Sequence, residues 1–331
     1  MAYRSLLSLD ELSLEEITAV LDAAATYLPR VRAGGFKDDT LRGRSVLLLF
    51  YEASTRTRVS FELAGKLLGA DTINVSAKGS SVEKGESIAD TAQTLSAMGL
   101  NAAVMRHSAA DAVALFNRHF AGAVLNAGSG RGEHPSQALL DALTLRQAGI
   151  LTACKRIAIV GDIEHSRVMR SSARLLARFG MQVTLVAPPS LMPLGWQSRA
   201  RSDARRLQHA TADERAARFT SRPTEDVFEW SCDLDSVLPQ ADAVMMLRMQ
   251  RERMSGGEVT TLDEFSKLYG LNSRRLKLLP SGAAIMHPGP VNRGVEVSEA
   301  VFSDPRCRIN DQVSAGVAVR CALLRWACGL L

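Results

Sequence analysis

The sequence lacks the features of several large protein classes. Its 331 residues contain no apolar run as long as the ~18–20 residues that span a membrane. Acidic residues interrupt the N-terminal stretch MAYRSLLSLDELSLEEI before an apolar segment can form, so we expect no signal peptide. The five cysteines are odd in number and show no CxxC pair. This usage indicates a reducing, cytoplasmic environment and argues against a zinc module.

Internal repeats and low-complexity tracts are also missing, and the composition is that of an ordinary globular protein, with 23% charged and 5% aromatic residues. Disorder, collagen and coiled coil are therefore disfavoured as the overall class. A length of 331 residues suggests two domains, or one large one. The net charge of +5 is compatible with nucleic acid or with small anionic substrates.

Arginines are concentrated between residues 197 and 222. Two interpretations of this segment are open, a solvated surface helix and a nucleic-acid-binding patch. No aromatic residue lies between these arginines before Phe219, so stacking on bases is poorly supported. We therefore favour the surface helix.

Short apolar runs alternate with segments of helical periodicity along the chain. The apolar runs are Val46–Phe50, Thr72–Val75, Ala103–Met105, Ala123–Leu125, Ile157–Val160, Val183–Val186, Ala243–Leu247 and Ala284–Met286. The helical segments are Thr57–Leu68, Ser87–Met98, Pro135–Gln147 and Arg167–Phe179. This alternation predicts an α/β protein with parallel sheets.

A change of composition near residues 149–155 predicts a domain boundary. We place a first domain over residues 1–149 and a second over 150–304. The stretch Val313–Leu330 is apolar nearly all round, which is typical of a helix buried on several sides.

The stretch FYEASTRTR, residues 50–58, follows a predicted buried strand and opens a helix. Ser54 or Thr55 can cap that helix, which leaves N–H groups and the positive end of the helix dipole facing outward. Hydroxyl groups and Arg56 beside these N–H groups make a phosphate site without a glycine-rich loop. The simpler interpretation is a capped helix with surface arginines. The position at a strand's carboxyl end favours a ligand, because ligands bind there in α/β sheets.

Other polar residues follow the remaining predicted strands of the first half. His134 and Gln137 stand at the start of a helix, where a histidine can donate to a substrate carbonyl and a glutamine can accept from an amide. A capping histidine and a surface glutamine are an equally good interpretation. Arg106 ends a predicted strand and points into the same crevice. Lys84 lies in a polar loop and can reach a phosphate or carboxylate, although an exposed, mobile lysine is the better interpretation.

The second half carries a parallel set of candidates. The stretch VGDIEHSR, residues 160–167, resembles a dinucleotide-binding turn but lacks G-x-G-x-x-G, which disfavours a dinucleotide. Arg167 and Arg248 both follow predicted strands and suit a substrate with two carboxylates. The segment HPGPVNRG, residues 287–294, forms a rigid turn whose backbone groups can address a ligand. No nucleophile stands beside a convincing base and no metal cluster appears, which favours direct group transfer by positioning and electrostatics.

These motifs occur in one order and together resemble the catalytic chain of aspartate carbamoyltransferases over nearly the whole sequence. The motifs are FYEASTRTRxSFE, SSxxKGES, MRH, HPSQALLD, GDIxHSR, MLRxQxER and HPGPVNRGVE. The related ornithine enzymes share STRT and HPxQ but carry a cysteine in an HCLP segment, which this chain lacks. The resemblance implies two doubly wound parallel-sheet domains, with the C-terminal helix, residues 305–331, returning to complete the first.

The resemblance also implies roles for the residues of the first half. A phosphate group of carbamoyl phosphate would be held by Ser54, Thr55, Arg56 and Thr57. Arg106 would bridge the phosphate and the carbonyl oxygen, and His134 would polarise the carbonyl with Thr57. Gln137 and the backbone at Gly289 and Pro290 would bind the carbamoyl amide.

For aspartate, the resemblance implies binding by Arg167, Arg248 and Gln250, with Lys84 as a further contact. Ser81 and Lys84 would enter the site of a neighbouring subunit, so that a homotrimer is the minimal active unit. Glu52 would hold the arginines in position. No metal and no cofactor is implied.

The implied reaction is attack of the aspartate α-amine on the carbamoyl carbon, followed by departure of phosphate, as a step of de novo pyrimidine biosynthesis. Thr57, Arg106 and His134 would hold the tetrahedral oxyanion. Two alternatives stay open, an ornithine carbamoyltransferase and a nucleic-acid-binding regulator using residues 197–222. A larger assembly with a dihydroorotase-like or regulatory chain also stays open.

Overall fold

A computed structural model describes residues 3–76, 85–193, 228–250 and 261–331. Ser81, Lys84 and the arginine-rich segment 197–222 lie outside these described residues. The chain divides into two compact units, the first formed by Met1–Leu143 with Val313–Leu331 and the second by Thr144–Gln312. Among the described helices, none is long and apolar enough to cross a membrane.

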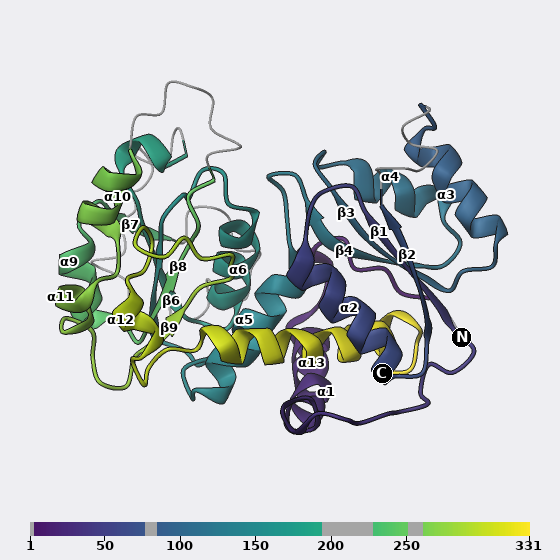
Figure 1. The fold of residues 1–331 in the computed structure, drawn as a ribbon, viewed down its shortest axis with the longest axis horizontal. Helices are drawn as coiled ribbons and strands as arrows, with labels where there is room; N and C mark the ends of the chain where they lie inside the picture. The colour runs from purple at the N-terminus through teal and green to yellow at the C-terminus, as the bar shows by residue number, and fades with distance from the viewer. Residues whose placement is uncertain (1–2, 77–84, 194–227, 251–260) are drawn as a thin grey trace. The chain divides into compact units, whose positions relative to one another are not determined.

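The first unit is built on a four-stranded parallel sheet of order β2-β1-β3-β4 (Figure 1). Its strands are β1 Ser45–Phe50, β2 Asp71–Ser76, β3 Ala102–His107 and β4 Ala123–Ser129. Its helical elements, before the C-terminal helix, are η1 Leu9–Glu11, α1 Leu14–Ala33, α2 Thr55–Leu67, α3 Ile88–Ala97, α4 Ala112–His119 and most of α5 Pro135–Gln147.

Both faces of this sheet are covered at β1, whose successive side chains point to opposite faces, whereas the edge strand β2 is partly exposed. Leu47 and Leu49 of β1 pack with Ala92 of α3 and Phe116 of α4 in one cluster of buried residues. Val46, Leu48 and Phe50, which alternate with them, are also buried. Strands buried on both faces read as continuous apolar runs, which is why the sequence shows them so clearly.

The C-terminal helix, α13 Ile309–Ala327, contributes most of its length to the first unit. Figure 1 shows it beside α2, and the Cys321 thiol lies 4.0 Å from the Ala64 carbonyl oxygen. Arg325 donates to the Tyr27 hydroxyl of α1 at 3.0 Å, and the Ala327 carbonyl accepts from the Arg4 N–H at 2.9 Å. The return of the C-terminal helix to the first half of the fold is confirmed.

The second unit contains a five-stranded parallel sheet of order β7-β6-β5-β8-β9. Its strands are β5 Arg156–Val160, β6 Gln182–Val186, β7 Glu229–Ser231, β8 Ala243–Met246 and β9 Ala284–Met286. Its helical elements are α6 Arg167–Arg178, η3 Pro189–Leu191, α9 Leu234–Val237, η5 Leu238–Gln240, α10 Leu262–Tyr269, α11 Ser273–Leu276 and α12 Glu299–Phe302. The α/β class with two parallel sheets, predicted from the sequence, is confirmed.

Candidate active site

Both sheets reverse their strand order once, and the candidate residues stand at these two reversals. In the first unit β1 and β3 are neighbours, while β2 continues on the far side of β1. In the second unit β5 and β8 are neighbours in the same way. A reversal of this kind opens a crevice at the carboxyl ends of the strands, where α/β proteins bind ligands.

The turn after β1 leads directly into α2, whose N-cap residue is Ser54. The backbone of Ser54 is extended, and its side chain makes no capping hydrogen bond. Thr55 and Arg56 are exposed in the first turn, whereas Thr57 is buried at 6% exposure. The first N–H groups of a helix have no partner within it, so this helix end provides donors and positive dipole charge to an anion.

Arg106 stands at the end of β3, paired in register with Phe50 at the end of β1. Its Nε lies 3.1 Å from a Glu52 carboxylate oxygen, and its backbone carbonyl accepts from the Tyr51 N–H at 2.9 Å. Both side chains of the Glu52–Arg106 pair are mostly buried, with 21% and 15% exposure. The pair therefore holds the Arg106 guanidinium at the end of β3, and the role that the resemblance implies for Glu52, holding the arginines in position, stays a prediction.

The neighbouring His107 ring packs against the Tyr51 ring, with centroids 4.7 Å apart. Burial lowers the pKa of His107, while the charge of Glu52 opposes the shift. Burial likewise raises the pKa of Tyr51. Both rings are therefore neutral near pH 7, and Arg106 carries the positive charge at this strand end.

The third group of the first unit follows β4, the neighbour of β3. Pro135 occupies the first position of α5, which suits its fixed φ and missing N–H. His134 and Gln137 are both buried there, at 4% and 7% exposure, and the His134 carbonyl accepts from the Gln137 N–H at 3.0 Å. The segments that follow three adjacent parallel strands thus bring three groups to the carboxyl end of the sheet. These groups are the N–H donors at the start of α2, Arg106, and the His134–Gln137 pair.

In the second unit, Arg167 begins α6 after β5 and is buried at 3% exposure. Arg248 and Gln250 follow β8 and are partly exposed. Asp162 joins the two loops, because its carboxylate accepts from the His165 ring at 2.8 Å and from the Gln250 N–H at 3.3 Å. The two arginines predicted to bind carboxylates therefore follow adjacent strands, β5 and β8, at the second reversal.

The turn after β9 contains Gly289 and Pro290, joined by a cis peptide bond. The Gly289 N–H donates to His287 Nδ1 at 2.8 Å, and proline has no N–H, so these two residues have no further backbone N–H to offer a ligand. Glu296, which is fully buried, accepts from Asn292 Nδ2 at 2.9 Å and from the Met249 N–H at 3.1 Å. It therefore ties this turn to the loop that carries Arg248.

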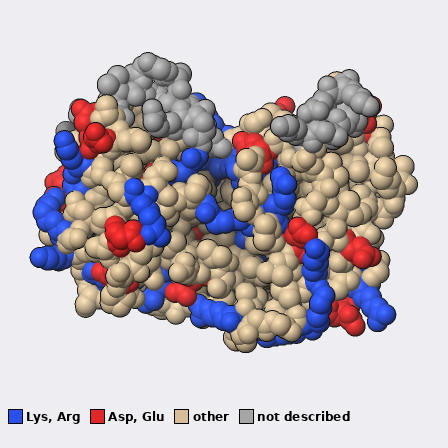
Figure 2. All heavy atoms as spheres, viewed as in Figure 1, with Lys and Arg blue, Asp and Glu red and all other residues tan. Residues whose placement is uncertain are grey.

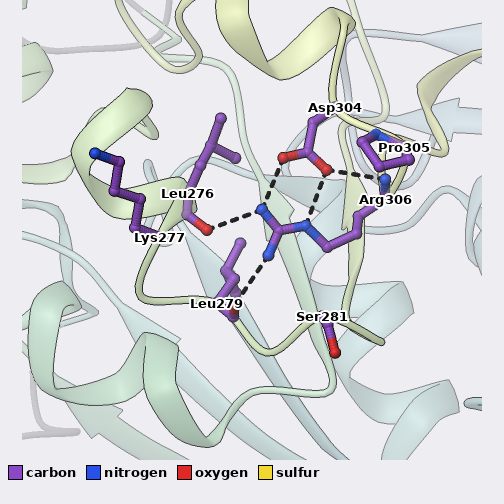
Figure 3. A pocket seen from close by; sticks show the side chains of 7 residues that line it. All are labelled: Leu276, Lys277, Leu279, Ser281, Asp304, Pro305 and Arg306. Carbon is purple, nitrogen blue, oxygen red and sulfur yellow. Dashed lines mark hydrogen bonds and ion pairs between the residues drawn. The ribbon is translucent and has the colours of Figure 1, made fainter.

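A separate pocket of about 460 Å³ lies at the opposite, amino end of β9 (Figure 3). The Arg306 guanidinium fills one side of it, donating to Asp304 at 2.7 Å and to the Leu276 and Leu279 carbonyls at 2.8 Å. Since the carbonyls and the carboxylate engage the guanidinium, we interpret Arg306 as a structural residue that closes the loop before β9. The pocket is not part of the candidate site.

Basic and acidic side chains are interspersed over much of the face drawn in Figure 2. Such mixing is typical of a solvated surface. Within the ranges that the structure describes, no three His, Cys, Asp or Glu side chains gather in a way that suits a metal ion.

Family models match nearly all of the chain. The carbamoyl-phosphate-binding domain of aspartate/ornithine carbamoyltransferases matches residues 4–147, and the Asp/Orn-binding domain matches residues 154–327. The chain belongs to the aspartate/ornithine carbamoyltransferase family. The resemblance read from the motifs is therefore confirmed.

Curated relatives within this family are named aspartate carbamoyltransferase catalytic subunits. The protein from Acidothermus cellulolyticus is 47% identical over 97% of this chain and 91% of its own length. The protein from Mycobacteroides abscessus is 46% identical over 97% of this chain and 95% of its own length. Both relatives are similar to the chain from end to end.

Solved structures show the same fold. Aspartate transcarbamoylase from Trypanosoma cruzi, crystallised with carbamoyl phosphate and aspartate, is 32% identical and superposes with a TM-score of 0.82. The match covers 98% of this chain and 96% of that one. The complex of the same enzyme with carbamoyl aspartate and phosphate gives a TM-score of 0.81.

Three buried carboxylates were given no role in the sequence analysis: Asp141, Asp162 and Glu296. Each lies inside a motif that the resemblance used, HPSQALLD, GDIxHSR or HPGPVNRGVE. Each is 0% exposed and accepts hydrogen bonds from a candidate residue or from its loop. The sequence did contain a signal for these carboxylates, because each is an acidic residue inside a motif whose other residues are candidates for ligand binding.

Proposed function

We propose that this chain transfers the carbamoyl group of carbamoyl phosphate to the α-amine of L-aspartate, giving N-carbamoyl-L-aspartate and phosphate. The observation that carries the proposal is the gathering of an anion-binding helix end, Arg106 and the His134–Gln137 pair at one sheet edge in a chain of this family. The names of its curated relatives support aspartate as the acceptor. The reaction is a step of de novo pyrimidine biosynthesis.

In this proposal the first domain, residues 1–149 completed by 305–331, binds carbamoyl phosphate. The phosphate lies at the start of α2 against Ser54, Thr55, Arg56 and Thr57. Arg106 bridges the phosphate and the carbonyl oxygen, in the orientation that Glu52 imposes. His134 and Thr57 polarise the carbonyl.

The carbamoyl amide is a donor and therefore needs acceptors. Gln137 supplies a side-chain oxygen, and the backbone at Gly289 and Pro290 supplies carbonyl oxygens. The Gly289 N–H is compatible with this assignment, because it donates to His287 and so does not compete as a donor to the ligand.

The second domain, residues 150–304, binds aspartate in this proposal. Arg167 and Arg248 pair with its two carboxylates, since a guanidinium binds a carboxylate through two parallel hydrogen bonds. Gln250 adds a polar contact from the same loop as Arg248. Asp162 holds the Gln250 backbone against the turn that precedes Arg167.

The proposed reaction begins when the aspartate amine attacks the carbamoyl carbon. Negative charge then develops on the carbonyl oxygen, where Thr57, Arg106 and His134 stabilise it. The carbon–oxygen bond to phosphate breaks next, and the proton that the amine loses passes to the departing phosphate, which leaves as a dianion stabilised by Arg56, Arg106 and Lys84. One preorganised donor of this kind typically contributes roughly 3–4 kcal/mol to the transition state.

We further propose a cytoplasmic homotrimer in which Ser81 and Lys84 act in a neighbouring subunit's site. Exposed apolar side chains of the first unit support association of copies, because Val59 and Leu63 of α2 and Ile73 of the edge strand β2 are 54%, 43% and 42% exposed. The segment with Ser81 and Lys84 directly follows this edge strand in the sequence. A dihydroorotase-like or regulatory chain is a further proposed partner of the trimer.

Phosphate release tests the activity. With carbamoyl phosphate present, we expect release to depend on L-aspartate and not on L-ornithine. Arg56→Ala should lower turnover roughly a hundredfold or more, whereas Arg42→Ala, which changes an arginine with 80% side-chain exposure, should leave it unchanged. Release that depends on ornithine would show that the chain is an ornithine carbamoyltransferase. Turnover of Arg56→Ala at the parental rate would refute the proposed phosphate site.

Hybrid trimers test the shared site. Lys84→Ala and Arg56→Ala each leave a pure trimer with defective sites only. Dissociation and reassembly of a mixture places an intact Arg56 beside an intact Lys84 in some hybrids, so a fraction of the activity should return. Hybrids that form and stay as inactive as the parents would show that Lys84 does not act across the interface.

A further inference from the structure

Gln137 and Asp141 lie one turn apart on α5, on the same face of the helix. Gln137 Nε2 donates to an Asp141 carboxylate oxygen at 3.0 Å. Gln137 is 7% exposed and Asp141 is 0% exposed, so this hydrogen bond is shielded from water. An ionised carboxylate has no hydrogen to donate, which means that only the NH2 end of the glutamine amide can face it.

A buried arginine of the same unit, Arg320, interacts electrostatically with Asp141. Arg320 of α13 is 4% exposed, and its guanidinium lies 5.1 Å from the Phe61 ring centroid. Gly316 makes this position possible, because a Cβ atom there would lie 2.5 Å from an Arg320 nitrogen. The guanidinium is thus packed between the Phe61 ring and the backbone at Gly316.

Burial lowers the pKa of Arg320 to about 10, and the charge of Asp141 opposes that shift. Arg320 therefore stays cationic at neutral pH. The positive charge of Arg320 favours the ionised form of Asp141, which is the acceptor-only form.

We propose that Asp141 is a positioning residue that fixes the orientation of the Gln137 amide. It holds Nε2 toward the protein interior, so that Oε1 faces outward and accepts from the NH2 group of the carbamoyl moiety. The inference deepens the proposed function and depends on it. Asp141 would thereby select a carbamoyl group over an acyl group of the same shape. If the Gln137 amide were reversed, its NH2 group would face the NH2 group of the carbamoyl moiety, and two donors would oppose each other.

Acetyl phosphate is the matched probe, since it carries the same phosphate and a methyl group in place of the amide. Two constants are measured for each variant: the KM for carbamoyl phosphate, and the inhibition constant of acetyl phosphate as a competitor of carbamoyl phosphate. The readout is the ratio of these two constants. In Asp141→Asn the introduced amide can donate to Gln137 Oε1 and favour the reversed orientation, so the KM for carbamoyl phosphate should rise about tenfold while the acetyl phosphate constant stays within about twofold. Asp90→Asn, at an exposed position of α3, should leave both constants unchanged.

Asp141→Asn also leaves Arg320 without its anion and can impair folding, so a second variant is needed. The double variant Asp141→Asn with Arg320→Met removes both charges, a change that buried ion pairs often tolerate. We expect the same loss of selectivity there, about tenfold. A folded variant with the parental ratio of the two constants would show that Asp141 only neutralises Arg320, and would overturn the proposal. A parent chain that does not use carbamoyl phosphate would instead refute the proposed function.

Discussion

The buried carboxylate of Glu296 provides a sharp test of how the second unit holds its candidate residues. One of its oxygens accepts from the Met249 N–H at 3.1 Å and from Asn292 Nδ2 at 2.9 Å. The other accepts from the Asn292 N–H at 2.7 Å and lies 3.8 Å from His287 Nε2. Met249 lies between Arg248 and Gln250 in the sequence, so Glu296 positions the loop that is proposed to bind the substrate aspartate.

The substitution Glu296→Gln keeps the shape and replaces one oxygen by an NH2 group. Whichever oxygen is replaced, at least one backbone N–H then faces another donor in a buried place. A buried unsatisfied donor costs about 1–3 kcal/mol, and the remaining hydrogen bonds lose their charge assistance, so we expect a destabilisation of about 3 kcal/mol. For a domain of this size that corresponds to a fall in Tm of about 6–12 °C.

Differential scanning calorimetry and aspartate saturation curves measure the two consequences. Glu299→Gln is the matched control, because Glu299 pairs with Arg293 at a surface where their side chains are 72% and 58% exposed. Such a pair contributes at most about 1 kcal/mol. A Glu296→Gln protein with parental Tm and parental KM for aspartate would refute the assignment of Glu296 as the link between the loops.

Two further predictions follow from the second unit. Hydrogen bonds from Arg306 lower the pKa of Asp304 below its ordinary 3.8, so this pair stabilises the fold above that pH and the stabilisation is lost as the pH falls through the lowered pKa. Asp304→Asn should therefore lower the free energy of unfolding at pH 7 and make it less dependent on pH below about 4. Urea unfolding at several pH values measures both effects, and an unchanged pH profile would contradict this prediction. Arg167→Ala and Arg248→Ala should each raise the KM for aspartate more than tenfold, which corresponds to a loss of about 1.5 kcal/mol or more of binding free energy. The KM for carbamoyl phosphate should stay nearly unchanged. Equal losses for both substrates in steady-state kinetics would show that the second unit does not bind aspartate selectively.

Most of the sheet architecture was predictable because most of its strands, β1, β4, β5 and β8 among them, are buried on both faces. The apolar runs Val46–Phe50 and Ile157–Val160 differ from the observed strands by one residue at their first ends. Strand β7, Glu229–Ser231, was not predicted, since three residues of mixed polarity give no periodic signal. Helix α1 was also unassigned, although Ser13 and Glu16 form a capping box that announces its start.

The candidate site was predictable in part, for a physical reason. Polar residues that follow a buried strand stand at its carboxyl end, so Arg106 and the start of α2 were placed by sequence order alone. The buried carboxylates were not predicted, because burial of an acid depends on partners such as Arg320 or the Met249 N–H that are distant in sequence. Ser81 and Lys84 lie outside the described residues, and their role remains a prediction.

The central claim is that the carbamoyl group passes to aspartate. Incubation of the chain with 13C-carbamoyl phosphate and equal concentrations of L-aspartate and L-ornithine, followed by mass spectrometry of the amino-acid products, tests it directly. The account predicts label in N-carbamoyl-L-aspartate, none above background in citrulline, and loss of the labelled product with Arg56→Ala. Label in citrulline, or equal label in both products, would contradict it.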